Sequence, residues 1–192
     1  MLTLYFAPGT SSMAVHIALH EIGVPFEARL MGPGATRQPE YRALNPEGKI
    51  PTLTINSRPM TEVAAILFYL ASRFPEAGLL PGGGVEAEAQ AISWMSFLAS
   101  TVHPARRQGP DHARGIYALA EARLGARDWA VGSNYSIADI HLFRLFWRFS
   151  RSFDPPRSDF TNLYAHHDRI LDRPAVRKTI EIESAIGYRL PA

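Results

Sequence analysis

The stretch from Asn45 to Leu53 carries the clearest sign of binding chemistry in this sequence. Its Ile50–Pro51 bond is a candidate for the cis form, which is uncommon and usually functional in folded proteins. A cis bend there would leave the backbone N–H and C=O of Ile50 unpaired and pointing into a cleft. Such groups suit an extended peptide ligand, which binds by strand-like pairing. The sequence therefore predicts a peptide-like ligand at Ile50.

A β-hairpin is predicted to hold this stretch in place. Two short apolar runs, residues 51–55 and 58–60, flank Asn56-Ser57, a pair that is typical of a tight turn. Pro51 is tolerated directly before the first strand because its missing N–H falls outside the ladder.

The residues before the hairpin predict a strand–helix–strand unit. Residues 2–6 alternate and are rich in β-formers, residues 13–22 have a helical apolar spacing, and residues 26–31 form a second strand. Such a unit implies parallel pairing through a right-handed crossover. With the hairpin and a helix over about residues 62–74, it predicts a β-α-β-α-β-β-α domain over residues 1–74.

A segment rich in proline and glycine, residues 75–84, follows this domain. It is compatible with an ordinary surface loop or with a linker. The change from mixed to purely helical character favours a linker, followed by an all-α domain over residues 85–192. The helices predicted there are residues 85–102, 111–125, 136–152, 162–171 and 175–184.

The clearest local fold signal in the second half is Tyr135-Ser136-Ile137-Ala138-Asp139-Ile140. Ser136 is suited to accept from the Asp139 backbone N–H, while the Asp139 side chain reaches back to the Ser136 N–H. Tyr135 and Ile140 occupy the positions of a hydrophobic staple. We expect this motif to serve folding and to leave ligand affinity almost unchanged.

Composition excludes several classes of protein. Lys and Arg number 20 and Asp and Glu 18, an excess of 20 − 18 = 2, which gives no reason to expect nucleic acid or an anionic membrane as partner. The sequence has no cysteine, so disulfides and thiolate sites are excluded. No apolar run approaches the roughly 20 residues of a membrane span, and no secretory signal is visible, so a cytoplasmic protein is expected. The histidines lack the spacing of a metal site.

Several strings together resemble one family, the glutathione S-transferase superfamily, and its bacterial beta class in particular. They are residues 5–19 (YFAPGTSSMAVHIAL), Leu79-Leu80-Pro81, the Ser-Ile-Ala-Asp box and Arg173-Pro174-Ala175-Val176. The resemblance covers nearly the whole chain. It implies a thioredoxin-like N-terminal domain followed by an all-α C-terminal domain, with glutathione as co-substrate.

In this family the residue at the start of the first helix meets the glutathione sulfur. The resemblance places Ser11 there, where beta-class proteins carry a cysteine, so mixed-disulfide chemistry is not available. A hydroxyl and helix N-terminal N–H groups lower the pKa of a thiol and supply more thiolate. Thr10 and Ser12 are alternatives, since one residue of loop shift exchanges them, and both serines are also suited to cap the helix.

The same resemblance implies the other glutathione contacts of the N-terminal domain. Glu62 matches the acid that receives the α-ammonium group, although it also suits a helix dipole. Val63 stands where a serine or glycine usually binds the γ-glutamyl carboxylate, so only its backbone N–H is left for that role. Ile50, with Pro51 after it, supplies main-chain groups, and Arg37 is a candidate for the glycyl carboxylate.

In the second half, His103 matches a beta-class histidine that faces the cysteinyl group. With Pro104 behind it, His103 is equally typical of a helix end next to a break. Arg106 and Arg107 would place positive charge near an anionic ligand, or are solvated arginines. The chain from His103 to the capping motif is shorter than in typical beta-class members, which puts bulky aromatic electrophiles in doubt.

Two functions follow from these observations. The first is a glutathione-dependent transferase that conjugates the glutathione thiolate to a small electrophile. The alternative is a non-catalytic binding or interaction protein on the same fold, which Val63 and the shortened helices favour. The resemblance also implies a homodimer, with Phe68, Trp94 and Phe97 as candidate contacts, although core packing explains them equally well.

Overall fold

The computed structural model describes residues 1–188, and the chain divides into two compact units. The first unit combines residues 1–74 with the segment that begins at Pro174, and the second runs from Pro75 to Arg173. The boundary after Phe74 coincides with the predicted linker. The C-terminal helix is grouped with the first unit, whereas the sequence predicts it within the helical domain.

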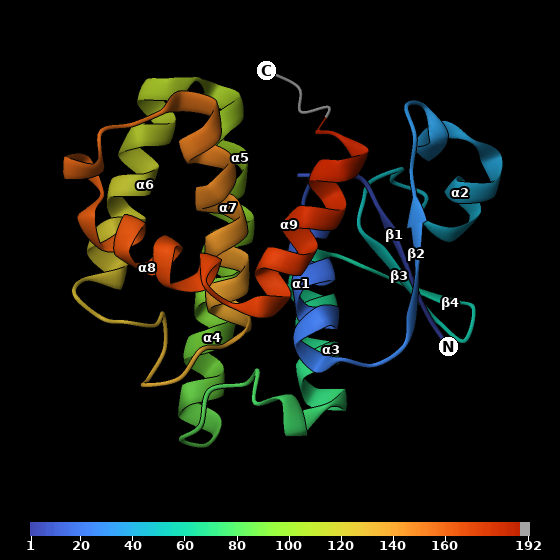
Figure 1. Cartoon of the computed structure of the whole chain (residues 1–192), viewed down its shortest axis with the longest axis horizontal. Helices are drawn as coiled ribbons and strands as arrows, with labels where there is room; N and C mark the ends of the chain where they lie inside the picture. Colours follow the sequence, from blue (N-terminus) through green and yellow to red (C-terminus); the bar gives the residue numbers. More distant parts are fainter. Residues whose placement is uncertain (189–192) are drawn as a thin grey trace. The chain divides into compact units, whose positions relative to one another are not determined.

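The first unit has the predicted β-α-β-α-β-β-α order, with an added C-terminal helix (Figure 1). Its elements are β1 (Leu2–Phe6), α1 (Ser12–Ile22), β2 (Phe26–Leu30), the 3₁₀ turn η1 (Ala35–Arg37), α2 (Pro39–Leu44), β3 (Thr52–Ile55), β4 (Arg58–Thr61), α3 (Val63–Arg73) and α9 (Pro174–Ile186). The strand order is β2-β1-β3-β4; β1 and β2 are parallel, and the other pairs are antiparallel.

Helix α1 forms the centre of this unit's core. Residues 12–19 are all buried, because α1 packs against β1, α3 and α9. Leu4 of β1 and Leu53 of β3 are fully buried as well. Figure 1 places α1, α3 and α9 on one side of the sheet and α2 on the other.

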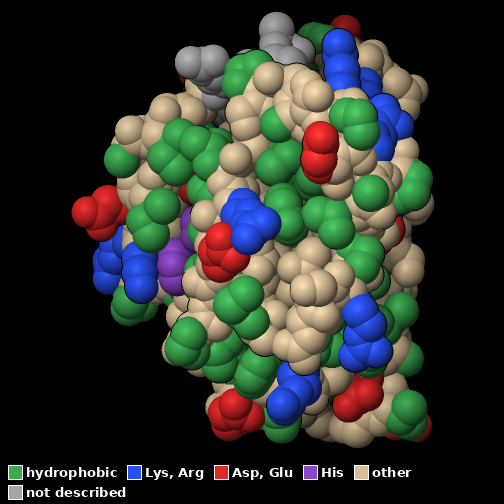
Figure 2. Space-filling view, turned by 90° about the vertical axis from the view of Figure 1, so that its right-hand side faces the viewer, with side chains coloured by type: hydrophobic (Ala, Val, Ile, Leu, Met, Phe, Trp, Pro, Cys, Tyr) green, Lys and Arg blue, Asp and Glu red, His purple; other side chains and the backbone are tan. Residues whose placement is uncertain are grey.

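The hairpin turn is confirmed. Asn56 and Ser57 both have positive φ angles, of 49° and 67°, which a two-residue type I′ turn requires. Seen from the side of β2, β4 and α2, acidic and basic side chains are interspersed over this unit (Figure 2), as the near-balanced charge predicts.

The second unit is helical, as predicted. It contains η2 (Pro75–Ala77), α4 (Val85–Phe97), the π-helical η3 (Leu98–Val102), α5 (His103–Ala105), η4 (Arg106–Gln108), α6 (Pro110–Leu124), α7 (Ile137–Phe153), η5 (Arg157–Asp159) and α8 (Thr161–Leu171). Residues 137–149 of α7 are all buried, so α7 is the central helix. Trp94 is only 2% exposed within this core, which argues against it as a dimer contact.

One expectation was wrong in this region: the helix does not break at Pro104. His103 keeps helical angles (φ −60°, ψ −45°), and helical turns continue to Gln108, ending at Gly109 with φ 96°. The π-helical turn directly before Pro104 explains the continuity, since its altered hydrogen bonding accommodates a residue that lacks an N–H.

The capping box at the start of α7 is confirmed and extended. The Ser136 N–H donates to Asp139 Oδ2 over 2.8 Å, and the Ala130 N–H donates to Asp139 Oδ1 over 2.7 Å. His166 Nε2 lies 2.9 Å from the same Oδ1. Asp139 and His166 are both buried. The Asp139 carboxylate therefore links α7 to α8 and to the loop that precedes α7.

We expect Asp139→Ala to lower the free energy of unfolding by about 3 kcal/mol or more, because several buried groups lose one acceptor together. Chemical denaturation measures this change. Asp111→Ala is the control, an exposed acid in the first turn of α6, with an expected loss of about 0.5 kcal/mol. Equal losses in the two variants would contradict the structural role of Asp139.

Within residues 1–188, none of the helices combines the length and the apolar character that crossing a bilayer requires.

Candidate functional site

Strand register brings three segments of the first unit to one end of the sheet. Tyr5 of β1 pairs with Thr52 of β3, and Thr52 pairs with Thr61 of β4. The chain leaves β1 after Phe6, enters β3 at Thr52 and leaves β4 after Thr61. The loop over residues 7–11, the Ile50–Pro51 bond and Glu62 therefore lie at the same end of the sheet, although they are far apart in sequence.

Hydrogen bonds within the loop separate the roles of its hydroxyl groups. Ser12 is fully buried, and its Oγ donates to Ala7 O over 3.1 Å and accepts from Ala7 N over 3.2 Å. Thr10 Oγ1 donates to the same carbonyl over 2.8 Å and lies 2.9 Å from Ser12 Oγ. Ser12 and Thr10 thus both take part in holding the loop closed, so these bonds favour Ser11 as the hydroxyl to meet a ligand, with the half-buried Thr10 as the alternative.

Ser11 is the N-cap residue of α1 and is 9% exposed. The first N–H groups of an α-helix have no intrahelical partner, and the helix dipole adds partial positive charge at this end. The hydroxyl of Ser11 and these N–H groups together favour an anionic atom placed before α1.

The loop is also fixed from the C-terminal helix, by a residue that the sequence reasoning missed. Glu183 of α9 is fully buried; its Oε2 accepts the Gly9 N–H over 2.7 Å, and its Oε1 lies 3.0 Å from His16 Nδ1. Thr179, one turn earlier, lies 2.8 Å from His20 Nδ1. Thr179 and Glu183 both lie on the buried face of α9. Two polar residues four positions apart on a buried helix face are the sequence signal that could have predicted this contact.

Burial explains why His20 does not add charge here. Burial, helped by the nearby His16 and Lys178, lowers the pKa of His20 to about 4. His20 is therefore neutral at pH 7, and its Nδ1 contacts the Thr179 hydroxyl as part of an uncharged ring.

The Ile50–Pro51 bond is cis, as predicted. The residues before it are anchored through the Lys49 carbonyl, which accepts from the Tyr41 hydroxyl over 2.6 Å and from Asn45 Nδ2 over 2.9 Å. Burial raises the pKa of Tyr41 and so keeps its hydroxyl protonated as a donor. Because β3 begins only at Thr52, the Ile50 backbone lies just outside the ladder.

Glu62 has an unusual backbone conformation. It is the N-cap residue of α3 with φ 67° and ψ 120°, and its side chain is exposed. Positive φ is costly for a residue with a Cβ, and such strain clusters at ligand sites. Its carbonyl accepts the Ile66 N–H over 3.0 Å, so the first turn of α3 fixes its direction. Val63 is buried, which leaves only its backbone for a ligand.

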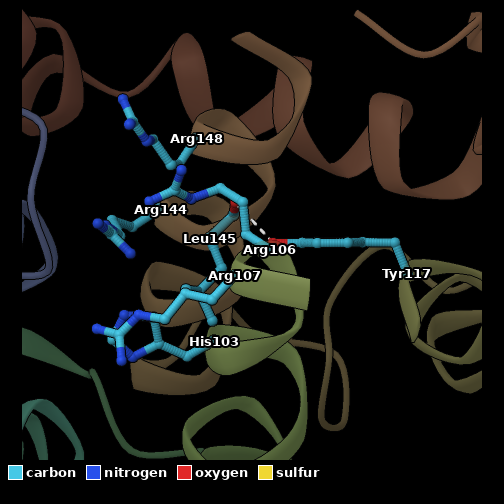
Figure 3. A pocket seen from close by; sticks show the side chains of 7 residues that line it. All are labelled: His103, Arg106, Arg107, Tyr117, Arg144, Leu145 and Arg148. Atoms are coloured by element: carbon cyan, nitrogen blue, oxygen red, sulfur yellow. Dashed lines mark hydrogen bonds between the residues drawn. The ribbon is translucent and has the colours of Figure 1, made fainter. Parts of the chain in front are cut away.

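The remaining predicted residues lie elsewhere. Arg37 is exposed at the end of η1, and no described contact directs it to Glu62 or Ser11. His103 and Arg106 belong to the helical unit, where both line a small cavity with Arg107, Tyr117, Arg144, Leu145 and Arg148 (Figure 3). The structure thus brings Ser11, Ile50 and Glu62 to one sheet end, and His103 and Arg106 to one cavity.

Comparison with known proteins matches both units to one family. Residues 4–78 match the model of the glutathione S-transferase N-terminal domain, and residues 104–174 match that of the C-terminal domain. A glutathione S-transferase of Xanthomonas campestris is 29% identical over 201 residues, which cover 94% of this chain and 98% of the relative.

Solved structures of glutathione S-transferases are similar to this chain as well. A sphingomonad glutathione S-transferase in complex with glutathione is 30% identical, with a TM-score of 0.86 over 95% of this chain and 98% of that one. The beta-class glutathione S-transferase of Sphingomonas chungbukensis is 33% identical, with a TM-score of 0.83 over 94% of this chain and 98% of that one.

Proposed function

Because the chain belongs to the glutathione S-transferase family, we propose that it binds glutathione at this sheet end and conjugates the glutathione thiolate to a small electrophile. The observation that carries the proposal is the convergence, set by strand register, of the Ser11 loop, the Ile50 backbone and Glu62. These groups offer a hydroxyl, main-chain pairing groups and a carboxylate, which together match the parts of a γ-glutamyl tripeptide.

Each group has a distinct task in this proposal. The Glu62 carboxylate receives the α-ammonium group, and the N–H groups at the start of α3, Val63 included, receive the γ-glutamyl carboxylate. The Ile50 backbone pairs with the cysteinyl residue as an added strand would. Ser11, with Thr10 as the alternative, donates to the sulfur.

The chemical step requires little covalent work from the protein. The thiol proton passes to solvent, the thiolate attacks the electrophilic carbon as an S–C bond forms, and the leaving group departs with its bonding electrons. Stabilisation of the thiolate and positioning supply the rate enhancement. With no cysteine in the chain, a mixed disulfide between protein and glutathione is not part of the cycle.

Ser11→Ala tests the catalytic part of the proposal. A hydrogen bond to a charged group contributes about 1.5–3 kcal/mol, so we expect kcat to fall by roughly 10- to 100-fold, with a smaller change in glutathione affinity. Iodoacetamide and 1-chloro-2,4-dinitrobenzene serve as an aliphatic and an aromatic electrophile. Thr10→Val is the matched comparison and identifies which hydroxyl faces the sulfur.

Unchanged turnover in both variants would overturn the proposed role of the hydroxyls. Wild-type protein that binds glutathione and shows no turnover with either electrophile would favour the non-catalytic alternative, for which Val63 is the motivating departure from the family pattern.

Some parts of the proposal rest on the resemblance alone. His103 and Arg106 as glutathione contacts, Arg37 at the glycyl carboxylate, the homodimer and the cytoplasmic location all stay predictions. Phe68, which is 38% exposed on α3, is the aromatic candidate for a dimer contact that burial leaves open.

A further inference from the structure

The first unit contains a cavity of its own, which we call the sheet-face cavity. Its volume is about 320 Å³, within the range of roughly 300–1,000 Å³ that is typical of small-molecule sites. All the residues that line it belong to the first unit, and none of them is a glutathione contact predicted above. They are Met1, Thr3, Tyr5, Arg29, Leu44, Thr54, Asn56 and Ser57.

The sheet-face cavity lies on the side of the sheet that faces away from α1. Leu4 of β1 is fully buried on the side of α1, and successive side chains of a strand point to opposite faces, so its neighbours Thr3 and Tyr5 point away from α1. Thr54 is paired with Thr3 and therefore lies on the same face. Leu44, the last residue of α2, also lines the cavity, and Figure 1 shows α2 on that side of the sheet. The cavity is thus formed by the sheet and the end of α2.

This cavity is distinct from the proposed glutathione site. Asn56 and Ser57 form the turn at one end of the hairpin, whereas the proposed glutathione contacts Ile50 and Glu62 lie at its other end. The turn and the glutathione contacts are therefore separated by the length of β3 and β4, and the two sites share no residue.

One hydroxyl in the cavity wall is buried without a hydrogen bond. Thr54 is only 6% exposed, and no group within residues 1–188 forms a hydrogen bond with its hydroxyl. Thr3, its partner across the strands, donates instead to Glu27 Oε2 over 3.2 Å. A buried hydroxyl without a hydrogen bond costs free energy, so Thr54 favours a polar ligand group in the cavity.

The positive charge in the cavity wall is already compensated. Arg29 Nε donates to Glu27 Oε1 over 2.8 Å, and Arg29 Nη1 donates to the Tyr5 hydroxyl over 3.1 Å. The hydrogen bond from Arg29 holds the pKa of Glu27 below its usual value, so this carboxylate stays ionised at neutral pH. Because the charges of Arg29 and Glu27 offset each other, the cavity favours an uncharged ligand over an ion.

The same bonds leave the cavity rich in hydrogen-bond donors. A guanidinium carries five N–H groups, and the bonds of Arg29 to Glu27 and Tyr5 use two of them. The Tyr5 hydroxyl accepts from Arg29, which leaves its own proton to donate. Met1 and Leu44 add apolar side chains beside these donors. A planar ring with carbonyl oxygens or ring nitrogens along its edge matches such a wall.

We propose that the sheet-face cavity binds an uncharged nucleoside, with Arg29, Tyr5 and Thr54 in contact with the edge of the base. The faces of the base pack against the apolar part of the wall. The sugar hydroxyls meet Asn56 and Ser57 at the hairpin turn, since amide and hydroxyl groups both donate and accept hydrogen bonds. This site goes beyond the proposed glutathione site and does not depend on it.

Titration of the isotopically labelled full chain with uridine, and separately with adenosine, tests the proposal through the NMR shifts of backbone amides. We expect saturable shifts with at least one of the two nucleosides, concentrated at Thr3, Thr54 and Asn56. Benzoate, a planar anion, should bind about tenfold more weakly than that nucleoside, because the charge of Arg29 is already offset by Glu27.

Two variants test individual contacts. Thr54→Val keeps the branched side chain and removes the hydroxyl, so nucleoside affinity should fall about 3- to 10-fold. Without ligand, this variant should melt at or above the wild-type temperature, because a buried hydroxyl without a hydrogen bond is lost. Arg29→Met should weaken binding about tenfold or more, as expected for a lost charged donor. Arg58→Met is the matched control, an exposed arginine that pairs with Ile55 on the other face of the sheet, and it should bind as the wild type does.

Absence of shifts with both nucleosides, or unchanged affinity in Arg29→Met, would overturn the proposal. Benzoate that binds as tightly as the nucleosides would overturn the assignment of an uncharged ligand. Glu62→Ala separates this site from the proposed glutathione site, since nucleoside affinity should survive in it. Loss of nucleoside binding in Glu62→Ala would show that the nucleoside occupies the glutathione site instead, and would equally overturn the proposal.

Discussion

Replacing Glu183 with alanine is expected to lower the free energy of unfolding by about 3–5 kcal/mol, because two buried groups lose their partner together and each such loss costs about 1–3 kcal/mol. The carboxylate is fully buried and binds both the Gly9 N–H and His16 Nδ1. Alanine at this position takes the acceptor from the Gly9 N–H and the hydrogen-bond partner from His16 Nδ1 at once. Chemical denaturation monitored by circular dichroism measures the loss.

Two further variants sharpen this result. Glu181→Ala, an exposed acid on the same helix, should change stability by no more than about 0.5 kcal/mol. Glu183→Gln keeps one acceptor for Gly9 and should lose less than the alanine variant. Because Gly9 lies two residues before Ser11, the alanine variant should also bind glutathione more weakly while still folded. A stability within 1 kcal/mol of wild type would contradict the role assigned to Glu183.

Glu62→Ala is expected to raise the glutathione dissociation constant by roughly 10- to 100-fold, since a hydrogen-bonded charge pair contributes about 1.5–3 kcal/mol. The exposed carboxylate leaves little reason for a loss of stability. Calorimetric titration measures the affinity. Glu40→Ala, an exposed acid in the first turn of α2, is the control and should bind as the wild type does.

A glycine at the same position separates binding from backbone strain. Glu62 has a φ of 67°, a conformation that glycine adopts without a steric cost. Glu62→Gly should therefore be at least as stable as Glu62→Ala and should still lose glutathione affinity. Wild-type affinity in either variant would rule out Glu62 as the ammonium contact.

Local signals made much of the fold predictable from sequence. The cis bond at Ile50–Pro51, the Asn56-Ser57 turn and the capping box at Ser136 each depend on a few neighbouring residues, and all were confirmed. The family and the fold, a thioredoxin-like unit followed by helices, are confirmed as well. The parallel pairing of β1 with β2 is also as the strand–helix–strand pattern predicts.

Contacts between distant residues were not predictable in the same way. Gly9 and Glu183 are 174 positions apart, and nothing near either residue announces the bond. The grouping of α9 with the first unit was unpredictable for the same reason, because it depends on hydrogen bonds from buried polar residues of α9 to distant residues of α1. At Pro104 the proline rule failed since the preceding π-helical turn, a rare local structure, has no strong sequence signal.

The roles of Thr10, Ser11 and Ser12 show where structure adds most to the site. All three residues are typical of a helix start, so the sequence alone does not decide which of them faces the glutathione sulfur. The bonds from Ser12 to Ala7 show that its hydroxyl holds the loop closed, which favours Ser11 as the proposed contact to the sulfur. The cavity of the helical unit was equally hidden, because Arg144 and Arg148 of α7 line it together with Arg106 of η4, which lies far earlier in the sequence.

Calorimetric titration of the wild-type protein with reduced glutathione, beside cysteinylglycine under the same conditions, tests the central claim most directly. The claim predicts saturable binding of glutathione, and much weaker binding of the dipeptide, which lacks the γ-glutamyl group that Glu62 and the start of α3 would hold. Absence of glutathione binding would contradict the account outright. Equal affinities for the two peptides would contradict the placement of the γ-glutamyl group at Glu62.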